Sequence, residues 1–330
     1  MAHEELLRID DLIKVFITGG GFSRSRLVAV DDASFSLNSG KPEIFTLAGE
    51  SGSGKTTLAR IILGLIEPTK GSVKYKNREV THISKKEKRS WFMKEVQPIF
   101  QNPFEAFSPL KKVETYLYNT AANYNMVKKG QSIKEYVNEK LGVVGLLPEE
   151  VEGRFPNELS GGQLQRMSIA RALLTNPSLL IADEPVSMVD ASLRMSIVNL
   201  FKDLRDNMGV SIVYITHDLA TAYYASDRIA IMFRGIIVEL GPVQKVLYDP
   251  LHPYTKLLKK AVLEIDAEKR WIEETKLPLS SMEKKEFQRE GCCKFADRCP
   301  QAMDICTSLE PEEFFVDERT VKCHIYNHSN

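Results

Sequence analysis

Apolar residues in the first hundred positions gather into short runs that are rich in β-branched side chains. Such runs are typical of strands, and we expect strands at 28–30, 33–37, 44–48 and 72–75. A longer stretch at 56–65 is predicted to form one apolar helix. This part of the chain is therefore expected to be a β-rich sheet domain built around a single helix.

Between about residues 102 and 175 the β-branched runs nearly vanish, which favours a helical insert. Strand character returns at 179–183 and 211–216, and a helical stretch at 191–208 separates these two strands. This alternation is typical of a parallel βαβ unit and of the α/β fold class. The helices expected in the insert are 113–126, 132–143, 148–151 and 163–175.

The composition changes after about Gly241, where prolines and charged runs become frequent. All five cysteines also lie in this last part, at positions 292, 293, 299, 306 and 323. We therefore predict two domains. The first is a core at 1–240 that contains the helical insert at 102–175, and the second is a small C-terminal extension at 241–330.

Charge and hydropathy exclude two classes of protein. The 330 residues carry 44 Lys plus Arg and 44 Asp plus Glu, so no net charge attracts nucleic acid. The basic run at 85–89 is short and mixed with acid, and we expect a solvated loop there. No window reaches the roughly 18 to 20 consecutive apolar residues that a membrane-spanning helix needs. The acidic N-terminus lacks the features of a secretory signal, so we expect a cytoplasmic protein that reaches a membrane through partners.

The strand expected at 44–48 leads into a glycine-rich loop, and the helix at 56–65 follows it. This order is the context that a phosphate-binding Walker A loop requires. Glycines let backbone amides turn toward a phosphate, Lys55 supplies positive charge to the β- and γ-phosphate oxygens, and the Thr56 hydroxyl is expected to bind Mg²⁺. The nucleotide-binding residues predicted here are Gly49, Glu50, Ser51, Gly52, Ser53, Gly54, Lys55, Thr56 and Thr57.

Two acidic residues, Asp183 and Glu184, end the apolar strand expected at 179–183. Ligands sit at such strand ends in parallel sheets. Asp183 is predicted to hold Mg²⁺, and Glu184 is predicted to polarise the water that attacks the γ-phosphate. Together with the loop, these residues predict an ATPase that uses ATP and Mg²⁺, but they do not separate the many classes of P-loop ATPase.

The segment Leu159-Ser160-Gly161-Gly162-Gln163 narrows the class. It precedes a helix, so its amides and the helix N-terminus can bind an anion. The segment resembles the signature motif of ABC transporter ATPases, which lies just upstream of the Walker B strand in that family. The resemblance implies that Ser160, Gly161, Gly162 and Gln163 contact ATP bound to an opposite subunit, with two ATP molecules sandwiched in a head-to-tail dimer.

Three further positions resemble functional residues of the same family, and their roles are implied by that resemblance. Gln101 is similar to the Q-loop glutamine that reaches Mg²⁺ and links the ATP site to the helical insert. His217 resembles the switch histidine that hydrogen-bonds the γ-phosphate. The segment 187–190 resembles the D-loop, in which Asp190 keeps the family residue whereas the two middle residues replace the more usual Ala-Leu.

The adenine ring needs an aromatic side chain on which to stack, and Phe16 is our choice. Phe16 could equally belong to the core, and Phe22 lies nearby. The resemblance implies a P-loop ABC ATPase core with an antiparallel β subdomain and a helical insert.

The end of the chain resembles one branch of the family. Gly241-Pro242 followed by His252-Pro253-Tyr254-Thr255 is similar to the C-terminal extension of oligopeptide and dipeptide importers, and the segments 44–64 and 101–110 agree. In that prokaryotic branch two related ATPase subunits pair beneath two membrane permeases. An extracytoplasmic solute-binding protein delivers the solute to these permeases. The resemblance implies ATP-driven import of di- or oligopeptides at the cytoplasmic side of the membrane. The branch also includes importers of oligosaccharides or nickel, so the solute stays open.

Four of the cysteines repeat a spacing of the same branch, and they are Cys293, Cys299, Cys306 and Cys323. Family members with this tail resemble iron–sulfur proteins in which four thiolates hold a [4Fe–4S] cluster, and four thiolates are chemically suited to iron–sulfur or zinc coordination. Zinc stays an alternative, although the C-x₂-C spacing of zinc ribbons is absent. Cys292 departs from the pattern and could be a spare thiol or compete with Cys293 as a ligand.

Two other classes of function compete with the transport motor. A soluble ABC ATPase that acts on DNA, ribosomes or iron–sulfur assembly would carry long coiled coils, two cassettes or no cysteine-containing tail. A regulatory subunit without hydrolysis would lack the catalytic glutamate or the switch histidine. The single cassette, the importer-type tail, Glu184 and His217 argue against both.

Overall fold

The computed structural model describes residues 5–18, 25–127, 129–263 and 291–327. These residues form two compact units. Unit 1 comprises the described parts of Met1–Ser39, Phe45–Thr81 and His217–Asn330, and unit 2 comprises Gly40–Ile44 and His82–Thr216. The C-terminal segment and the N-terminal strands thus share one unit, whereas the predicted boundary near residue 240 lies inside it and stays a prediction.

Unit 1 contains an antiparallel four-stranded sheet in the order β2-β1-β4-β5. The runs expected at 28–30 and 33–37 belong to one long strand. The chain bends within β1 and β2 at Asp11 and Asp32, whose φ angles are 45° and 52° and which lie at shifts in the strand register. The strands are β1 (Glu5–Thr18), β2 (Ser25–Asn38), β4 (Lys70–Tyr75) and β5 (Arg78–Glu79).

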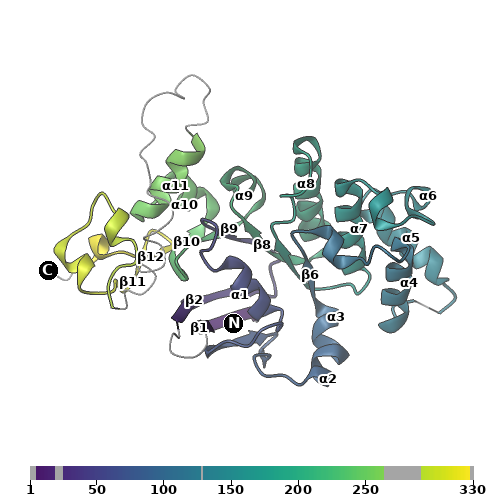
Figure 1. Cartoon of the computed structure of the whole chain (residues 1–330), viewed down its shortest axis with the longest axis horizontal. Coiled ribbons are helices and arrows are strands. Elements are labelled where there is room, and N and C mark those ends of the chain that lie inside the picture. The colour runs from purple at the N-terminus through teal and green to yellow at the C-terminus, as the bar shows by residue number, and fades with distance from the viewer. Residues whose placement is uncertain (1–4, 19–24, 128, 264–290, 328–330) are drawn as a thin grey trace. The chain divides into compact units, whose positions relative to one another are not determined.

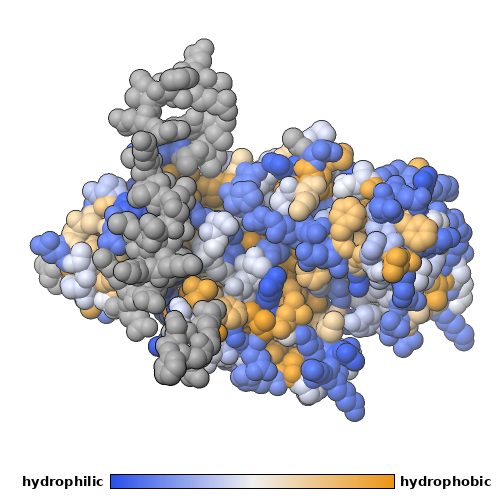
Figure 2. All heavy atoms as spheres, in the orientation of Figure 1, coloured by the Kyte–Doolittle hydropathy of each residue, from blue (hydrophilic) through white to orange (hydrophobic). Residues whose placement is uncertain are grey.

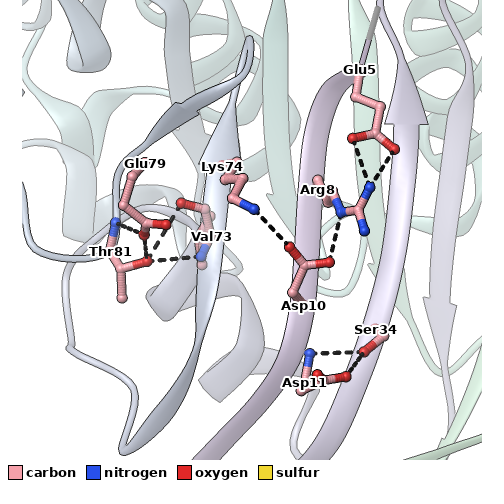
Figure 3. Close-up of polar contacts among 9 residues, drawn as sticks. All are labelled: Glu5, Arg8, Asp10, Asp11, Ser34, Val73, Lys74, Glu79 and Thr81. Atoms are coloured by element: carbon pink, nitrogen blue, oxygen red, sulfur yellow. Dashed lines mark hydrogen bonds and ion pairs between the residues drawn. The ribbon is translucent and has the colours of Figure 1, made fainter. Parts of the chain in front are cut away.

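Polar side chains connect neighbouring strands of this sheet (Figure 3). The carboxylate of Asp10 on β1 accepts from Arg8 Nε at 2.6 Å and from Lys74 Nζ on β4 at 3.3 Å. At the bend in β1, the backbone N–H of Asp11 donates to Ser34 Oγ at 2.8 Å, and this hydroxyl donates to Asp11 Oδ1 at 3.1 Å. The Ser34 hydroxyl therefore satisfies the amide that the bulge takes out of the strand ladder.

The second sheet of unit 1 follows the order β11-β12-β10-β9-β3, in which β9 is parallel to β3 and antiparallel to β10. A core of buried residues from β9, β10 and the neighbouring helices includes Phe233, Tyr254 and Phe295. The C-terminal hairpin joins this sheet through β12, as the yellow strands in Figure 1 show. The elements are β3 (Ile44–Ala48, with 45–48 in this unit), α1 (Lys55–Ile62), α9 (Leu219–Ala225), β9 (Arg228–Phe233), β10 (Ile236–Pro242), α10 (Val243–Tyr248), α11 (Pro253–Leu263), β11 (Glu313–Val316) and β12 (Arg319–Lys322), with 3-10 turns at Ala296–Arg298, Asp304–Thr307 and His324–Tyr326.

Unit 2 contains three parallel strands in the order β8-β7-β6 and a group of helices in which α4, α5 and α7 pack together (Figure 1). The helical insert expected at about 102–175 is therefore present. The elements are α2 (Lys85–Glu87), α3 (Met93–Glu95), β6 (Val96–Ile99), α4 (Val113–Asn123), α5 (Ile133–Val143), α6 (Pro148–Val151), α7 (Gly161–Leu173), β7 (Leu179–Asp183), α8 (Ala191–Met208) and β8 (Ser211–Thr216), with a π-helical turn at Lys88–Phe92 and 3-10 turns at Pro103–Ala106 and Pro156–Glu158. The α/β class predicted from the sequence is confirmed.

The basic run at 85–89 is helical, so the solvated loop expected there is wrong. Ser84 and Glu87 form a capping box that starts α2, in which Ser84 Oγ accepts from the Glu87 amide at 3.2 Å and the Ser84 amide donates to the Glu87 carboxylate at 3.2 Å. This reciprocal cap satisfies two amides at the helix start. The side chains of the run nevertheless lie at the surface. Helix α2 has no buried residue, and in the π-helical turn that follows only Phe92 is buried.

Among the described residues, no helix combines the length and the apolar composition needed to cross a membrane. Figure 2 shows hydrophobic and hydrophilic residues interspersed on the face that it draws. Single exposed apolar side chains of this kind are ordinary on protein surfaces.

Candidate functional site

The predicted phosphate loop connects β3 to α1 in unit 1, and two of its glycines, Gly49 and Gly54, lie against the backbone of two other strands. A Cβ atom on Gly49 would lie 2.1 Å from the carbonyl oxygen of Met232 at the end of β9. A Cβ atom on Gly54, whose φ is 105°, would lie 2.2 Å from the carbonyl oxygen of Ala29 on β2. Both positions exclude any side chain, so the shape of the loop depends on strands that are distant in the sequence.

Lys55 lies inside this loop and is 5% exposed. Its ammonium donates to the carbonyl oxygens of Gly49 and Glu50, each at 2.8 Å, and lies 3.4 Å from Ser53 Oγ. The loop therefore surrounds one buried positive charge with its own carbonyls. A buried ammonium in a glycine-rich loop is suited to bind an anion such as a phosphate.

The remaining candidate residues of unit 1 lie at element ends or edges. Thr56 is exposed in the first turn of α1, and Thr57 beside it is half-buried. His217 is exposed and directly precedes Asp218, whose carboxylate caps α9 by accepting from the amide of Ala220 at 2.9 Å. Asp218 therefore fixes the start of α9 beside the histidine.

Phe16 lies half-buried on β1, where it pairs with Leu27 of β2. The ammonium of Lys14 lies over its ring, 5.0 Å from the ring centroid. Phe22, the neighbouring aromatic residue, lies outside the described residues. The choice of Phe16 as the adenine-stacking residue stays a prediction.

In unit 2 the predicted catalytic carboxylate is bonded to the predicted Q-loop glutamine. Gln101 Nε2 donates to Glu184 Oε2 at 3.1 Å, which joins the ends of the parallel neighbours β6 and β7. Asp183, the last residue of β7, lies next to Ile215 of β8 and is half-buried like Glu184. The structure therefore brings Gln101, Asp183 and Glu184 to one edge of the parallel strands.

The backbone at Glu184 is in a conformation that non-glycine residues rarely adopt, with φ at 45°. Its N–H donates to the carbonyl of Ile215 at 2.9 Å, and its own carbonyl accepts from Ser187 Oγ at 2.9 Å. Such backbone strain is often found at functional sites, where it costs of order 1–3 kcal/mol. These hydrogen bonds hold the strained residue in place.

The predicted signature segment forms the start of α7. Ser160 Oγ accepts from the Gln163 amide at 3.2 Å, and Gln163 Oε1 accepts from the Ser160 amide at 3.1 Å. A Cβ atom on Gly161 would lie 3.1 Å from the carbonyl oxygen of Met188, and one on Gly162 would lie 2.7 Å from Leu193 Cδ1. The two glycines thus let the signature helix approach the predicted D-loop and the first turn of α8.

Ser160, Met188 and Asp190 are exposed, and the Met188 side chain is 58% exposed. The predicted signature and D-loop residues therefore lie together on an accessible part of unit 2. Sequence reasoning did not predict their packing, because glycine in a signature segment indicates phosphate contact and not the closeness of a neighbouring loop.

Two residues of the C-terminal segment contact the phosphate loop within unit 1. The amide of Glu50 donates to the hydroxyl of Tyr254 at 3.1 Å. The guanidinium of Arg298 donates to both carboxylate oxygens of Glu50, from Nη1 at 3.0 Å and from Nη2 at 2.9 Å. Sequence reasoning assigned no role to Arg298 and used Tyr254 only as a family mark, since no local pattern links positions 248 residues apart.

The five cysteines are free thiols. The amide of Cys293 donates to the carbonyl of Cys306 at 3.0 Å. The pKa of the Cys293 thiol is raised to about 11, mainly because the thiol is buried, and the thiols of Cys306, Cys323 and Cys299 contribute to this rise. The thiols of Cys299, Cys306 and Cys323 thus lie near enough to Cys293 to act on its pKa.

Within the described part of the chain, no group of three or more His, Cys, Asp or Glu side chains is arranged to hold a metal ion. The predicted metal-cluster extension is therefore not supported by the geometry. The donor set itself suits a thiolate centre, because backbone amides bond to three of the thiols, from Phe295 to Cys293, from Gln301 to Cys299 and from Ile325 to Cys323.

Comparison with known proteins gives two family matches. The family described as ABC transporter matches residues 30–187, and the family described as oligopeptide/dipeptide transporter, C-terminal region, matches residues 238–306.

Among curated proteins, a putative peptide import ATP-binding protein of Brucella abortus (strain 2308) is 38% identical over 98% of this chain and 95% of its own length. The oligopeptide transport ATP-binding protein AppF of Bacillus subtilis (strain 168) is 35% identical over 98% of both chains. A solved ATP-binding cassette, described as a dimer in a post-hydrolysis state bound to ADP and Pi, is 26% identical with a TM-score of 0.62 over 72% of this chain and 98% of its own.

Proposed function

The chain belongs to the ABC transporter ATP-binding family, whose members are ATP-hydrolysing transporter subunits, and from that premise we propose that it powers the import of di- or oligopeptides. The observation that carries this proposal is the match of residues 238–306 to the C-terminal region of oligopeptide/dipeptide transporters. The names of the relatives from Brucella and Bacillus support the same solute class. Import of oligosaccharides or nickel is the alternative within this branch.

We assign the chemistry of ATP hydrolysis to the two sets of candidate residues. Lys55 and the loop amides bind the phosphates, and the exposed hydroxyl of Thr56 and the carboxylate of Asp183 would hold Mg²⁺. Glu184 orients the attacking water, and its hydrogen bond to Gln101 keeps the carboxylate at the strand edge. His217 bonds to the γ-phosphate.

The signature residues act on the ATP of a second ATPase subunit. The exposure of Ser160 and Asp190 supports this role, because residues that serve a partner's site must be accessible. The cassette solved as a dimer with ADP and Pi supports the same arrangement. The partners proposed for this chain are a second, related ATPase subunit, two membrane permeases and an extracytoplasmic solute-binding protein, with the chain at the cytoplasmic side of the membrane.

Transport in proteoliposomes tests the solute. The chain is reconstituted with the proposed permeases and the proposed second ATPase, and a binding protein loaded with a peptide, an oligosaccharide or nickel is added. We expect ATP hydrolysis and uptake to rise with the peptide-loaded protein and not with the other two. Stimulation by the oligosaccharide or by nickel would replace the peptide with that solute.

We also propose that Cys293, Cys299, Cys306 and Cys323 hold a [4Fe–4S] cluster, with Zn²⁺ as the alternative. The mutual influence of the four thiols and the amides that donate to three of them support this assignment. A cluster of four irons is larger than one ion, so its ligands need not converge on a single point. Such a group would supply cross-links that stabilise a small segment with little core of its own.

Metal analysis of protein purified without oxygen tests this centre. We expect about four irons per chain and a broad absorption near 400 nm, which Cys299→Ser abolishes and Cys292→Ser leaves unchanged. One equivalent of zinc in colourless protein would replace the cluster by the alternative. Protein with neither metal would show that the four thiols are not a metal site.

A further inference from the structure

Glu50 is the residue of the phosphate loop that the C-terminal segment holds from two directions. Arg298 binds its carboxylate with both terminal nitrogens, in the bidentate geometry that fixes orientation as well as distance. Tyr254 accepts a hydrogen bond from its backbone N–H. One loop residue thus has its side chain and its main chain fixed by groups that lie 204 and 248 residues later in the sequence.

Arg298 is itself held by aromatic rings of the unit 1 core. Its guanidinium lies 5.6 Å from the ring centroid of Phe233 and 5.8 Å from that of Phe295. These two rings are 5.3 Å apart, edge to face, and Tyr254 lies 4.5 Å from Phe233 and 5.5 Å from Phe295. Cation–π contact and close packing therefore restrict the conformation of the Arg298 side chain, in addition to its ion pair with Glu50.

Tyr254 has equally little freedom. Its ring is fully buried, and its amide donates to Nδ1 of His252 at 3.0 Å. The amide of His252 in turn donates to the buried carboxylate of Glu239 on β10 at 3.0 Å. The hydroxyl that receives the Glu50 amide is therefore fixed to the sheet through a chain of buried hydrogen bonds.

We propose that Arg298 and Tyr254 are positioning residues for the Walker A loop, through which the C-terminal extension sets the nucleotide affinity of its own subunit. Both residues act through Glu50, whose carbonyl also accepts from the Lys55 ammonium. Loss of either contact would let the loop populate other conformations, and nucleotide affinity would fall in proportion to the binding-competent fraction.

The position of Arg298 connects this loop to the cysteines. Arg298 ends a one-turn helix, Ala296–Arg298, that directly precedes Cys299, and Cys293 and Cys299 pack against the same core as Phe233 and Tyr254. Any change that unfolds the cysteine-containing segment would therefore release the arginine from Glu50. This inference holds whichever metal the thiols bind, and it requires only that the loop binds nucleotide.

A double-mutant cycle on Glu50 and Arg298 tests the proposal. We use Glu50→Gln and Arg298→Met, because methionine keeps much of the arginine stem on the aromatic rings, and we measure binding of the fluorescent nucleotide mant-ATP to the full chain. Each single variant should weaken binding about fivefold, because losing a bidentate ion pair that contributes about 1 kcal/mol changes an equilibrium constant by about that factor. The double variant should be no weaker than the singles. Tyr254→Phe should weaken binding in a similar way.

The matched control is another ion pair between the C-terminal segment and the N-terminal strands. Lys322 Nζ lies 2.7 Å from Asp32 Oδ2 and does not contact the phosphate loop, so Lys322→Met should leave the affinity for mant-ATP unchanged. Wild-type affinity in Arg298→Met, additive losses in the double variant, or an equal loss in Lys322→Met would each overturn the proposal. Lys55→Ala abolishes binding if the Walker A assignment is right, which separates failure of that assignment from failure of this one.

Discussion

Gly54 offers a sharp test of how the phosphate loop is built. In Gly54→Ala the new Cβ atom would lie 2.2 Å from the carbonyl oxygen of Ala29, and φ at this position is 105°. The backbone conformation alone costs about 1–2 kcal/mol for a residue with a side chain, and the clash with a strand carbonyl cannot be relieved by a side-chain rotation. We expect a total loss of free energy of unfolding of more than about 3 kcal/mol.

Gly52 is the matched control in the same loop. Its φ is 80°, but a Cβ atom there would meet no heavy atom within 4 Å. Gly52→Ala should therefore lose only the conformational part, about 1–2 kcal/mol. Thermal melting of both variants separates the two contributions, because 1 kcal/mol corresponds to roughly 2–4 °C in a domain of about 150–250 residues. Equal melting temperatures for the two variants would refute the close approach of Gly54 to β2.

Three further predictions concern catalysis, assembly and pH. Glu184→Gln should keep ATP binding but lower turnover by about 10² or more, and steady hydrolysis at the wild-type rate would reject the assignment. Ser160→Ala should impair hydrolysis at the partner's site more than at its own, which a mixed dimer with one catalytically dead subunit can measure. Burial lowers the pKa of His252 to about 3, so the unfolded chain binds more protons than the folded one as pH falls below about 6.5. The stabilisation is thus present above that pH and is lost toward pH 3, by up to about 5 kcal/mol. His252→Asn should flatten the dependence of the urea midpoint on pH.

The sequence predicts best where the determinants are local. The phosphate loop, the helical insert and the strand that ends in Asp183 each depend on neighbouring residues, and the structure has elements at those positions. The prediction for the basic run at 85–89 was wrong although its determinants are local. Its charge composition suggested a loop, whereas Ser84 and Glu87 start a helix by capping. Capping is also local, so the spacing of these two residues could have predicted it.

The contacts that fix the loop could not be predicted in this way. Glycine at positions 49 and 54 is required by the backbones of β9 and β2, and a sequence pattern records only that glycine is present. Glu50 was predicted only as one of the nucleotide-binding residues of the loop, because its partners Tyr254 and Arg298 come from a segment that was assigned to another domain. Four cysteines at a familiar spacing predicted a metal centre, yet the described residues contain no arrangement suited to a metal ion.

The boundary predicted near residue 240 divides a set of buried groups that depend on each other. Glu239 on β10 is fully buried, and its carboxylate accepts from the amides of Leu251 at 2.9 Å and His252 at 3.0 Å. Arg319, 3% exposed, lies 3.9 Å from the same carboxylate. A chain that ended at 240 would leave this buried charge without these partners, which costs far more than an exposed ion pair does. The C-terminal extension therefore supplies hydrogen-bond and charge partners to a buried carboxylate of β10, and we expect a chain that ends at residue 240 to be less stable than the full chain.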